Sequence, residues 1–542
     1  AGTGDPWSAW SPVGSLFAGL LVSWDQGQIE LAHRVLWWFH MALAFALIAY
    51  WTYSKLVHVL LVPAGVYWRD LKPKGELPFI DVEDEGLLSF GCGRLEELTW
   101  KDLFDTQACV RCNRCQDLCP AYATGKPLSP KAFIQDLGAE LEQRGPIIYR
   151  LQKEAAAQER NAADAAESEK ASKAVPALPK AEALLENADL ADAERAIVDR
   201  PLVGAVIAPE TLWACTTCGA CAAVCPADIQ TPDFIVGLRR HLALEQGEFP
   251  EGAAEALENT ASVGNPWGLD PYERMDWAQG LDVPVAEEGE DYDILYWVGC
   301  AASYDRRARR IARAMVKILK TAGVKFAVMA EERCHAEFAR RLGEEYLYQT
   351  AAQENIENFS RFKFKEVLTA CPHCFNTLKN EYPAFDGGSF AVIDHSSFIS
   401  RLFAEGKLPR SAMQSERVVW HDPCYLARQN GIVRAPREVL AAVGSAEFDP
   451  AEYGANTLCC GAGGGQMWTD QKTQKKRINV IRLESLQNTA SQCGASKIAT
   501  GCPHCLTMLE SAKSMVNGAQ ELQVLDIAEV VAAKLPDEAS PT

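Results

Sequence analysis

The chain has 542 residues, of which 48% are hydrophobic and 23% charged, so it is long and apolar enough to form several folded domains. Its net charge of −19, from 53 basic and 72 acidic residues, argues against non-specific nucleic-acid binding, which needs a basic surface. All but two of its 19 cysteines fall into four clusters, a pattern that indicates metal binding in a reducing compartment rather than a disulfide framework.

A long apolar segment lies near the start of the chain. Residues 35–52 carry one ionisable group, His40, and apolar character resumes over residues 56–68. This length predicts a transmembrane helix, the alternative being a buried core helix. By the positive-inside rule, basic residues on its C-terminal side predict that the rest of the chain lies on the cytoplasmic side of a bacterial or archaeal inner membrane. These residues are Lys55, Arg69, Lys72 and Lys74.

Three histidines fall within this segment. In one continuous helix His40 and His58 share a face, because 18 residues make a whole number of turns, and they stand about 27 Å apart along the axis. Such a pair predicts axial ligands of two b-type haems, the alternative being histidines bonded to neighbouring helices. His33, on the same face, is a candidate for a quinone site or for a helix cap.

The run from His40 to His58 resembles the last helix of the respiratory nitrate reductase gamma subunit and related dihaem cytochromes b. In that family two histidines on this helix bind two haems, each paired with a histidine of an earlier helix. The resemblance implies that cytochrome b helices with the second ligands come from a missing N-terminal part or from another subunit. Residues 1–70 are assigned to this membrane segment.

Two cysteine runs follow, each with the spacing C-x2-C-x2-C-x3-C and a proline after the last cysteine. This is the run of bacterial two-cluster ferredoxins, in which three close thiolates hold one [4Fe–4S] cluster and the fourth reaches the other cluster. A structural zinc site is the alternative. The spacing predicts one cluster on Cys109, Cys112, Cys115 and Cys225, and a second on Cys215, Cys218, Cys221 and Cys119.

The ferredoxin-like domain is expected over residues 71–140 and 201–260. Residues 141–200, between the two runs, are rich in Ala, Glu and Lys. This composition predicts a solvated helical insertion with a mobile middle around Pro176 and Pro179, and no chemistry.

The C-terminal half contains an internal repeat. LTACPHCFNTL at 368–378 matches ATGCPHCLTML at 499–509, and each follows, by about 70–80 residues, a predicted strand that ends near Cys300 or Cys424. Short apolar runs alternate with helical stretches, which predicts an α/β fold in each copy. The first copy is expected over residues 290–410 and the second over 411–542.

The two copies carry different candidate ligands. The second copy has five cysteines and a glycine-rich tail that lets backbone approach closely. These cysteines are Cys424, Cys459, Cys460, Cys502 and Cys505. For the first copy three alternatives stay open: an ordinary [4Fe–4S] cluster, a modified cluster that uses His335 where the second copy has Cys460, and no cluster. A zinc site is the alternative for either copy. Its candidate ligands are Cys300, Cys334, Cys371, Cys374 and His335.

Residues 100–542 resemble the heterodisulfide reductase D family and its Cys-Cys-Gly relatives throughout. In that family a five-cysteine copy binds a non-cubane [4Fe–4S] cluster, where disulfides are reduced, and the resemblance implies such a cluster on the five cysteines of the second copy. We therefore predict a multidomain chain: a transmembrane helix, an α-helical two-cluster ferredoxin domain, and duplicated α/β Cys-Cys-Gly domains.

A few further polar residues lie near these patterns. His373 and His504, inside the two Cys-Pro-His-Cys turns, are candidates either for contacts that tune the clusters or for turn residues bonded to backbone. Three residues are candidates for a polar group near the cluster, although spacing alone does not place them there: His395, His421 and Asp422. Two cysteines belong to no pattern and are expected to be ordinary thiols: Cys92 and Cys493.

The order of haem helix, ferredoxin clusters and cluster-binding repeats predicts an oxidoreductase that moves electrons between cytoplasm and bilayer. No GxGxxG run follows a predicted strand, so flavin chemistry has to come from a partner. The same order resembles the membrane-bound electron-transferring-flavoprotein:quinone oxidoreductases of the Cys-Cys-Gly family, with local strings such as TGKPLSP and HDPCYLAR. That resemblance implies electron-transferring flavoprotein and membrane quinone as partners. The alternatives are a thiol/disulfide:quinone oxidoreductase and an electron-relay subunit of a larger respiratory complex.

Overall fold

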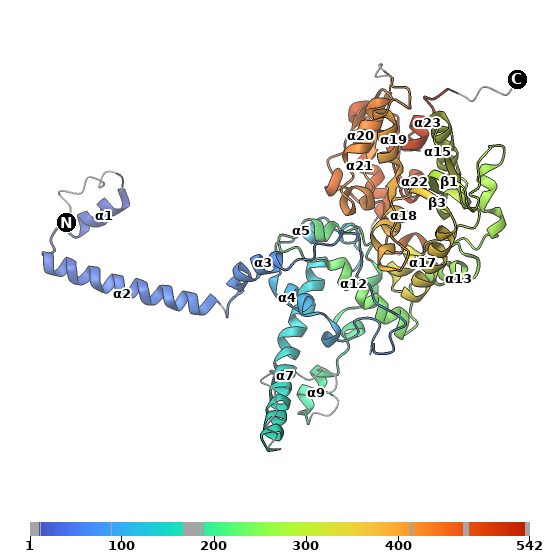
Figure 1. Cartoon of the computed structure of the whole chain (residues 1–542). Helices are drawn as coiled ribbons and strands as arrows, with labels where there is room; N and C mark the ends of the chain where they lie inside the picture. The colour runs from blue at the N-terminus through green and yellow to red at the C-terminus, as the bar shows by residue number, and fades with distance from the viewer. Residues whose placement is uncertain are drawn as a thin grey trace. The chain divides into compact units, whose positions relative to one another are not determined.

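The computed structural model describes residues 10, 12–51, 53–87, 89–165, 185, 189–411, 416–469 and 476–536. The chain divides into two compact units, Ala1–Tyr67 and Trp68–Thr542. The first unit contains the apolar segment, and the second contains every cysteine (Figure 1).

The first unit contains helices α1 (Pro12–Leu20), α2 (Gln26–Trp51) and α3 (His58–Tyr67). Within the described residues, α2 is the one helix that is long and apolar enough to cross a membrane, as judged by length and composition. None of its residues is buried within the chain. Its 26 residues span about 39 Å at 1.5 Å per residue, more than a hydrocarbon layer of about 30 Å.

The expected continuous helix through His40 and His58 is wrong. Helix α2 ends at Trp51, and Ser54, in extended conformation, accepts a hydrogen bond from the backbone N–H of Leu56. Because this cap starts a new 3-10 turn (Lys55–Val57), α3 begins only at His58. The 18-residue spacing therefore no longer places His40 and His58 on one helical face, whereas His33 and His40 do lie together on α2.

The two ferredoxin-type runs adopt matching local structures. In each run a helix precedes the first cysteine, a short helix carries the third cysteine, and another helix follows. The first run uses α4 (Trp100–Ala108), α5 (Arg114–Asp117) and α6 (Pro120–Ala123); the second uses α10 (Pro209–Trp213), α11 (Ala220–Ala223) and α12 (Thr231–Arg240). Helices α5 and α11 pack against each other, so the two runs form one helical body.

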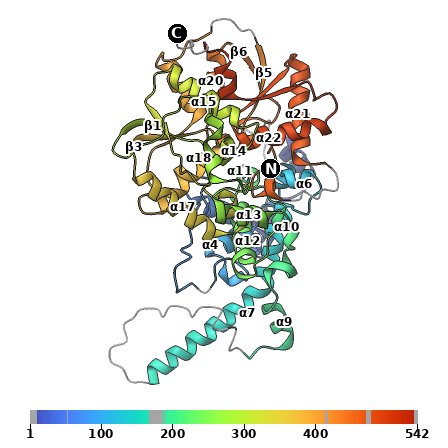
Figure 2. The same ribbon diagram turned by 90° about the vertical axis from the view of Figure 1, so that its right-hand side faces the viewer.

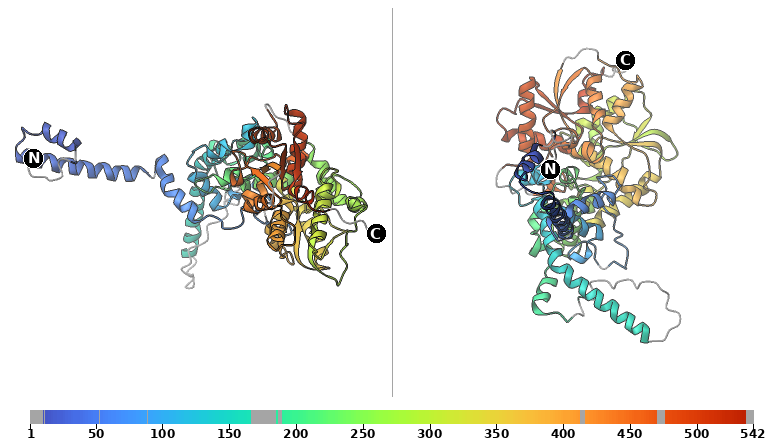
Figure 3. Two further views of the ribbon diagram at one scale, coloured as in Figure 1. Left: turned by 90° about the horizontal axis from the view of Figure 1, so that it is seen from above. Right: turned by 90° about the vertical axis from the view of Figure 1, so that its left-hand side faces the viewer.

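The insertion between the runs is helical where it is described. Helix α7 (Pro130–Ala165) extends away from the rest of its unit, with α9 (Asp192–Val198) near its base (Figure 2, Figure 3). Buried Arg144 pairs with Glu96 at 2.8 Å, and this ion pair ties α7 to the ferredoxin-like body. The expected mobile middle around Pro176 and Pro179 lies outside the described residues.

Two parallel four-stranded sheets follow, with the same strand order in each. The first sheet is β2-β1-β3-β4 and the second β6-β5-β7-β8. Their strands are β1 (Asp291–Trp297), β2 (Phe326–Val328), β3 (Lys363–Thr369), β4 (Val392–Asp394), β5 (Glu416–His421), β6 (Ser445–Phe448), β7 (Lys497–Thr500) and β8 (Gln523–Asp526). Matching registers pair Leu295 with Val367 and Val419 with Ile498. The predicted duplication of an α/β fold is confirmed.

Helices cover both faces of each sheet and share one core between the copies. Tyr296 of β1 and Trp420 of β5 are fully buried in the same hydrophobic cluster, where α15 packs against α23 (Figure 1). The helices are α13 (Ala253–Val263), α14 (Gly299–Tyr304), α15 (Arg309–Thr321), α16 (Glu337–Leu342), α17 (Glu345–Ser360), α18 (Pro372–Asn376), α19 (His395–Ala404), α20 (Arg434–Ala442), α21 (Ile478–Cys493), α22 (Pro503–Ala512) and α23 (Ile527–Ala532).

Cysteines lie just after the carboxyl ends of the two central strands in each sheet. Cys300 and Cys371 follow β1 and β3, which are neighbours in the first sheet. Cys424 and Cys502 follow β5 and β7, neighbours in the second. Sites in open α/β sheets form at the carboxyl ends of adjacent strands, so each sheet brings its own set of thiols together at one edge.

Candidate metal centres

The ferredoxin-type loops wind inward at matched positions. Arg111 and Asn113 have φ of 56° and 68°, and Thr217 and Gly219, at the equivalent places in the second run, have φ of 47° and 70°. A left-handed conformation costs a non-glycine residue about 1–2 kcal/mol. The same uncommon path in both loops turns each chain around a common centre, as binding to a compact cluster requires.

The fourth cysteine of each run lies with the first three cysteines of the other run. Cys225 neighbours Cys109 and Cys112, and Cys119 neighbours Cys215 and Cys218. Burial raises the pKa of Cys115 to about 11, and the adjacent thiols of Cys109, Cys225 and Cys112 contribute to this rise. Thiols crowded in this way are stable as thiolates only beside a metal, so two sets of four sulphurs fit two iron–sulphur clusters.

The five cysteines of the second copy form one buried group. The Sγ atoms of Cys505 and Cys460 are 3.2 Å apart, and Cys424 and Cys502 are hydrogen-bonded to Cys459 and Cys505. The backbone N–H of Gly461 donates to the Cys459 sulphur at 3.2 Å. Every cysteine in the described chain is a free thiol. A donor set of five sulphurs suits iron, whereas a structural zinc site takes four ligands.

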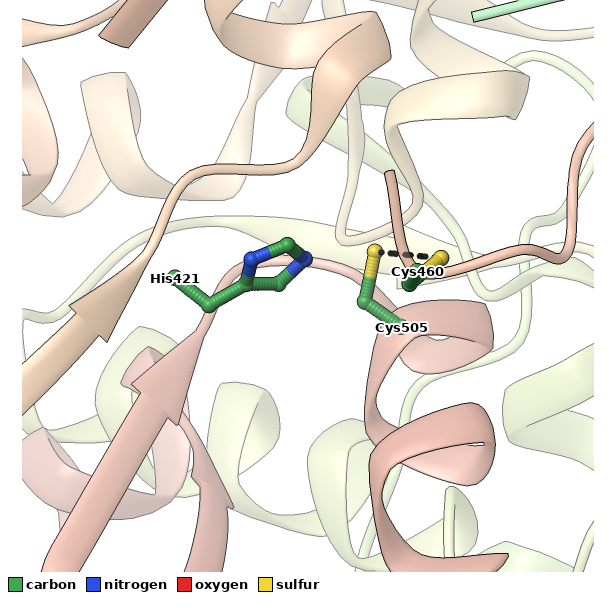
Figure 4. A group of neighbouring side chains, drawn as sticks. All are labelled: His421, Cys460 and Cys505. Carbon is green, nitrogen blue, oxygen red and sulfur yellow. Dashed lines mark hydrogen bonds between the residues drawn. The ribbon is translucent and has the colours of Figure 1, made fainter. Parts of the chain in front are cut away.

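Of the three polar candidates, one reaches these sulphurs. A ring nitrogen of His421 and the sulphurs of Cys460 and Cys505 lie within 4.8 Å of one another, and the ring points at them (Figure 4). Burial, together with the charge of Arg482, holds the pKa of His421 well below its ordinary value. His395 instead pairs with Asp526 at 3.1 Å.

Asp422 serves the loop that carries the cysteines. Its carboxylate accepts hydrogen bonds from Arg437 at 2.8 Å, from the Trp420 indole at 2.8 Å and from the Gly454 backbone at 2.7 Å. Burial alone would raise the pKa of Asp422, but these hydrogen bonds and the Arg437 charge hold it below its usual value. Asp422 therefore braces the chain on either side of the set, at residues 420–424 and 454–457.

The first copy also forms a buried group, with a histidine in it. Cys300 and Cys334 lie 3.6 Å apart, and the Nε2 atom of His335 is 3.1 Å from the Cys374 sulphur. Cys371 is hydrogen-bonded to Cys374. All four thiols are buried. His335 thus occupies the place that Cys460 has in the second copy, so four sulphurs and one imidazole are available to a metal.

The second-copy set touches both of its neighbouring sets. Cys459 is hydrogen-bonded to Cys218 of the ferredoxin-type run, and Cys502 is hydrogen-bonded to Cys371 of the first copy. The rings of His373 and His504 meet edge to face, with centroids 5.4 Å apart, between the two Cys-Pro-His-Cys turns. The thiol sets are therefore contiguous, which cysteine spacing alone could not indicate.

Two glycines allow the segment after Cys460 to approach the second ferredoxin-type run closely. A Cβ at Gly463 would lie 2.5 Å from the carbonyl oxygen of Thr216, and one at Gly464 would lie 2.5 Å from that of Cys215. No side chain fits at such distances. The glycine-rich tail after Cys460 therefore lies directly against the backbone of the second ferredoxin-type run.

Two buried cations beside these loops escaped the sequence analysis. Arg239 donates to the carbonyl oxygens of Cys215 at 2.7 Å and Arg341 at 2.6 Å. Lys126 donates to Gln466 at 2.6 Å, and burial lowers its pKa to about 8. A positive charge next to thiolates offsets part of their mutual repulsion. The TGKP string contains Lys126, but nothing in the sequence marks it as buried.

Comparison with protein-family models gives two matches. A model described as "4Fe-4S dicluster domain" covers residues 105–229, and one described as "Cysteine-rich domain" covers 294–379 and again 418–510. The EtfAB:quinone oxidoreductase of Syntrophomonas wolfei is 36% identical over 534 residues, which cover 96% of this chain and 71% of that protein. The chain belongs to the EtfAB:quinone oxidoreductase family. It is therefore an iron–sulphur oxidoreductase.

Other relatives of this family have related descriptions. A "Probable membrane-anchored ferredoxin" of Chromohalobacter salexigens is 38% identical over 464 residues, covering 85% of this chain and 64% of that protein. The heterodisulfide reductase D protein of Methanosarcina barkeri is 28% identical over 459 residues, covering 81% of this chain and 96% of that protein. The family suspected from the cysteine patterns is thus confirmed.

Proposed function

We propose that this chain passes electrons from reduced electron-transferring flavoprotein to the membrane quinone pool. The observation that carries the proposal is the likeness to EtfAB:quinone oxidoreductase over 96% of the chain, since the name of that protein states both donor and acceptor. The contact between Cys459 and Cys218 supports it, because it joins two centres by their ligands.

The placement of the thiols supports the following proposed ligand sets. Two [4Fe–4S] clusters would be held by the crossed ferredoxin-type cysteines, Cys109, Cys112, Cys115 and Cys225, and Cys215, Cys218, Cys221 and Cys119. A non-cubane cluster would be held by Cys424, Cys459, Cys460, Cys502 and Cys505. A further cluster would be held by Cys300, Cys334, Cys371 and Cys374, with His335 beside them. When bound, such clusters take up and release single electrons.

The protein part of the path has three tasks. Burial of the thiols in the first and second copies excludes water from these two sets, whereas Cys112 of the first ferredoxin-type run is exposed. Arg239 and Lys126 place positive charge beside the sulphurs nearest the second ferredoxin-type run, which favours the addition of an electron there. Gly463 and Gly464 keep the two loops in backbone contact, so the distance between the centres stays short.

The membrane end of the path is assigned to the first unit. Helix α2 would cross the bilayer, in keeping with the description of the Chromohalobacter relative as membrane-anchored. His40 and His58 would each ligate a haem b, with the second ligands coming from cytochrome b helices of a missing N-terminal part or of another subunit, and His33 would lie at the quinone site. Lys55, Arg69, Lys72 and Lys74 follow α2, so the cluster-bearing unit would lie in the cytoplasm.

The test is quinone reduction by membranes that contain the protein. Electron-transferring flavoprotein, reduced by an acyl-CoA dehydrogenase, is added with a water-soluble quinone, and quinol formation is followed. We expect turnover that Cys460→Ser abolishes and that the control Cys493→Ser leaves intact. Turnover with a dithiol but not with the flavoprotein would overturn the proposal in favour of a thiol/disulfide:quinone oxidoreductase.

A further inference from the structure

The imidazole ring of His421 points into the five-cysteine set. His421 is the last residue of β5 and is 1% exposed. Its Nε2 atom has no hydrogen-bond partner among the described residues. The sulphurs of Cys460 and Cys505 lie within 4.8 Å of the ring nitrogen that faces them (Figure 4). A buried polar atom without a partner calls for a role, and iron ligation or hydrogen bonding to sulphur are the two available.

The other ring nitrogen decides between these two roles. Arg482 donates from Nε to the Nδ1 atom of His421 at 2.9 Å. A guanidinium has only donors, so Nδ1 must present a lone pair and carries no proton. The ring proton of His421 is then on Nε2, and a protonated nitrogen has no lone pair for iron.

Arg482 is itself held in place. Its side chain is fully buried, and it also donates to the Glu452 carbonyl at 3.3 Å and to the Thr457 hydroxyl at 3.4 Å. These bonds fix the guanidinium from three directions, so the Nε2–H of His421 stays directed at the sulphurs. Histidines beside metal centres are commonly oriented in this way by a partner on the far ring nitrogen.

The first copy has a donor at the equivalent position. Trp297 ends β1 three residues before Cys300, as His421 ends β5 three residues before Cys424. Its Nε1–H is buried and has no partner among the described residues. A Cβ on Gly299 would lie 3.8 Å from this nitrogen and 3.3 Å from the Cys374 sulphur, so both groups border the same position. Cys374 corresponds to Cys505, the last cysteine of its turn.

The indole makes the comparison informative, because it can donate but can never coordinate a metal through its N–H. We propose that His421 and Trp297 are matched N–H donors to cluster sulphur, and that His421 is a positioning residue that raises the reduction potential of the second-copy cluster. A hydrogen bond to sulphur strengthens when reduction adds negative charge, which favours the reduced state. The inference rests on the cluster assignment made under the proposed function.

The test uses the full chain in membranes and a redox titration followed by electron paramagnetic resonance. His421→Leu removes the donor, whereas His421→Gln keeps an N–H that reaches the sulphurs and offers Arg482 a carbonyl oxygen. We expect His421→Leu to lower the reduced-to-oxidised ratio of this cluster about tenfold at fixed potential, a shift of about 59 mV for one electron. His421→Gln and the control His241→Gln, at a half-buried histidine that pairs with Glu245, should titrate like the unaltered protein.

Labelling the unaltered protein with 15N-histidine provides a measurement that needs no variant. We expect the paramagnetic signal of the second-copy cluster to show a weak hyperfine coupling, which arises from a nitrogen that is hydrogen-bonded to sulphur. A strong coupling from a directly bonded nitrogen, or equal loss of iron in the Leu and Gln variants, would overturn the proposal. If the cluster is intact and neither variant moves its potential, this inference alone fails. If Cys460→Ser leaves iron content and all signals unchanged, the cluster assignment itself fails.

Discussion

Replacing Gly464 with alanine tests the contact between the two cluster-bearing loops. Gly464 has φ of +64°, and a Cβ there would lie 2.5 Å from the Cys215 carbonyl oxygen and 2.9 Å from the Thr216 carbonyl carbon. The shorter contact is about 0.9 Å less than an ordinary one of 3.4 Å. Because both nearby atoms belong to backbone, one loop must move away from the other.

The loss of stability expected in Gly464→Ala has two parts. The left-handed backbone costs alanine about 1–2 kcal/mol relative to glycine. Crowding in a packed site adds about 1–3 kcal/mol. Gly406 is the matched control, since it has φ of +71° and would place its Cβ in open space. Gly406→Ala should therefore show only the first part, and Gly464→Ala should be less stable than this control by about 1–3 kcal/mol.

Two measurements check this prediction. Denaturant titration, followed by loss of cluster absorbance, compares the midpoints of the two variants. Flash reduction followed by electron paramagnetic resonance compares the rates at which electrons redistribute between the ferredoxin-type and second-copy clusters. We expect Gly464→Ala to unfold earlier and to redistribute electrons more slowly than Gly406→Ala. Equal midpoints and equal rates would show that the loops are not in the contact described.

The remaining predictions concern single residues. Cys460→Ser should change or remove one paramagnetic signal and leave the two ferredoxin-type signals, whereas unchanged iron and signals would refute the five-sulphur set. Asp422→Asn should cost about 3 kcal/mol in unfolding experiments, because it leaves Arg437 partly unpaired. Folding lowers the pKa of Asp422, so the ionised side chain stabilises the protein above the unfolded pKa of about 3.9, and this stabilisation is lost as the pH falls. The difference in free energy of unfolding between the unaltered protein and Asp422→Asn should therefore become smaller in acid. A difference that does not change with pH would contradict this. His40→Ala should remove one haem from membranes that hold the complete haem protein, and unchanged haem content would refute axial ligation.

Most of the fold could be predicted from the local spacing of the cysteines. A C-x2-C-x2-C-x3-C run encodes a loop around a compact cluster within a few residues, and the repeated Cys-Pro-His-Cys turns revealed the duplication of the sheets. The apolar segment near the start of the chain was predicted less well. Apolar residues resume at position 56, which suggested one helix, but the cap at Ser54 ends one helix and starts another, and a capping bond is a local geometry that hydropathy does not encode.

Long-range contacts account for the features that the sequence did not indicate. Cys371 and Cys502 lie 131 positions apart and meet only because the two sheets share a core. Arg482 reaches His421 across 61 residues from helix α21. Neither contact has a periodic or spacing signal, since each depends on how two separately folded copies pack together. The sequence could therefore nominate His421 as a polar candidate but could not assign its tautomer.

The proposed electron path can be tested by stopped-flow spectroscopy of the b-type haem that His40 and His58 would ligate. Membranes containing the protein are mixed with reduced electron-transferring flavoprotein, the haem α-band is followed, and quinone is then added. We expect rapid haem reduction that quinone reverses, and loss of both phases in Cys460→Ser. Haem that stays oxidised with the flavoprotein, yet is reduced when a dithiol is supplied, would contradict it.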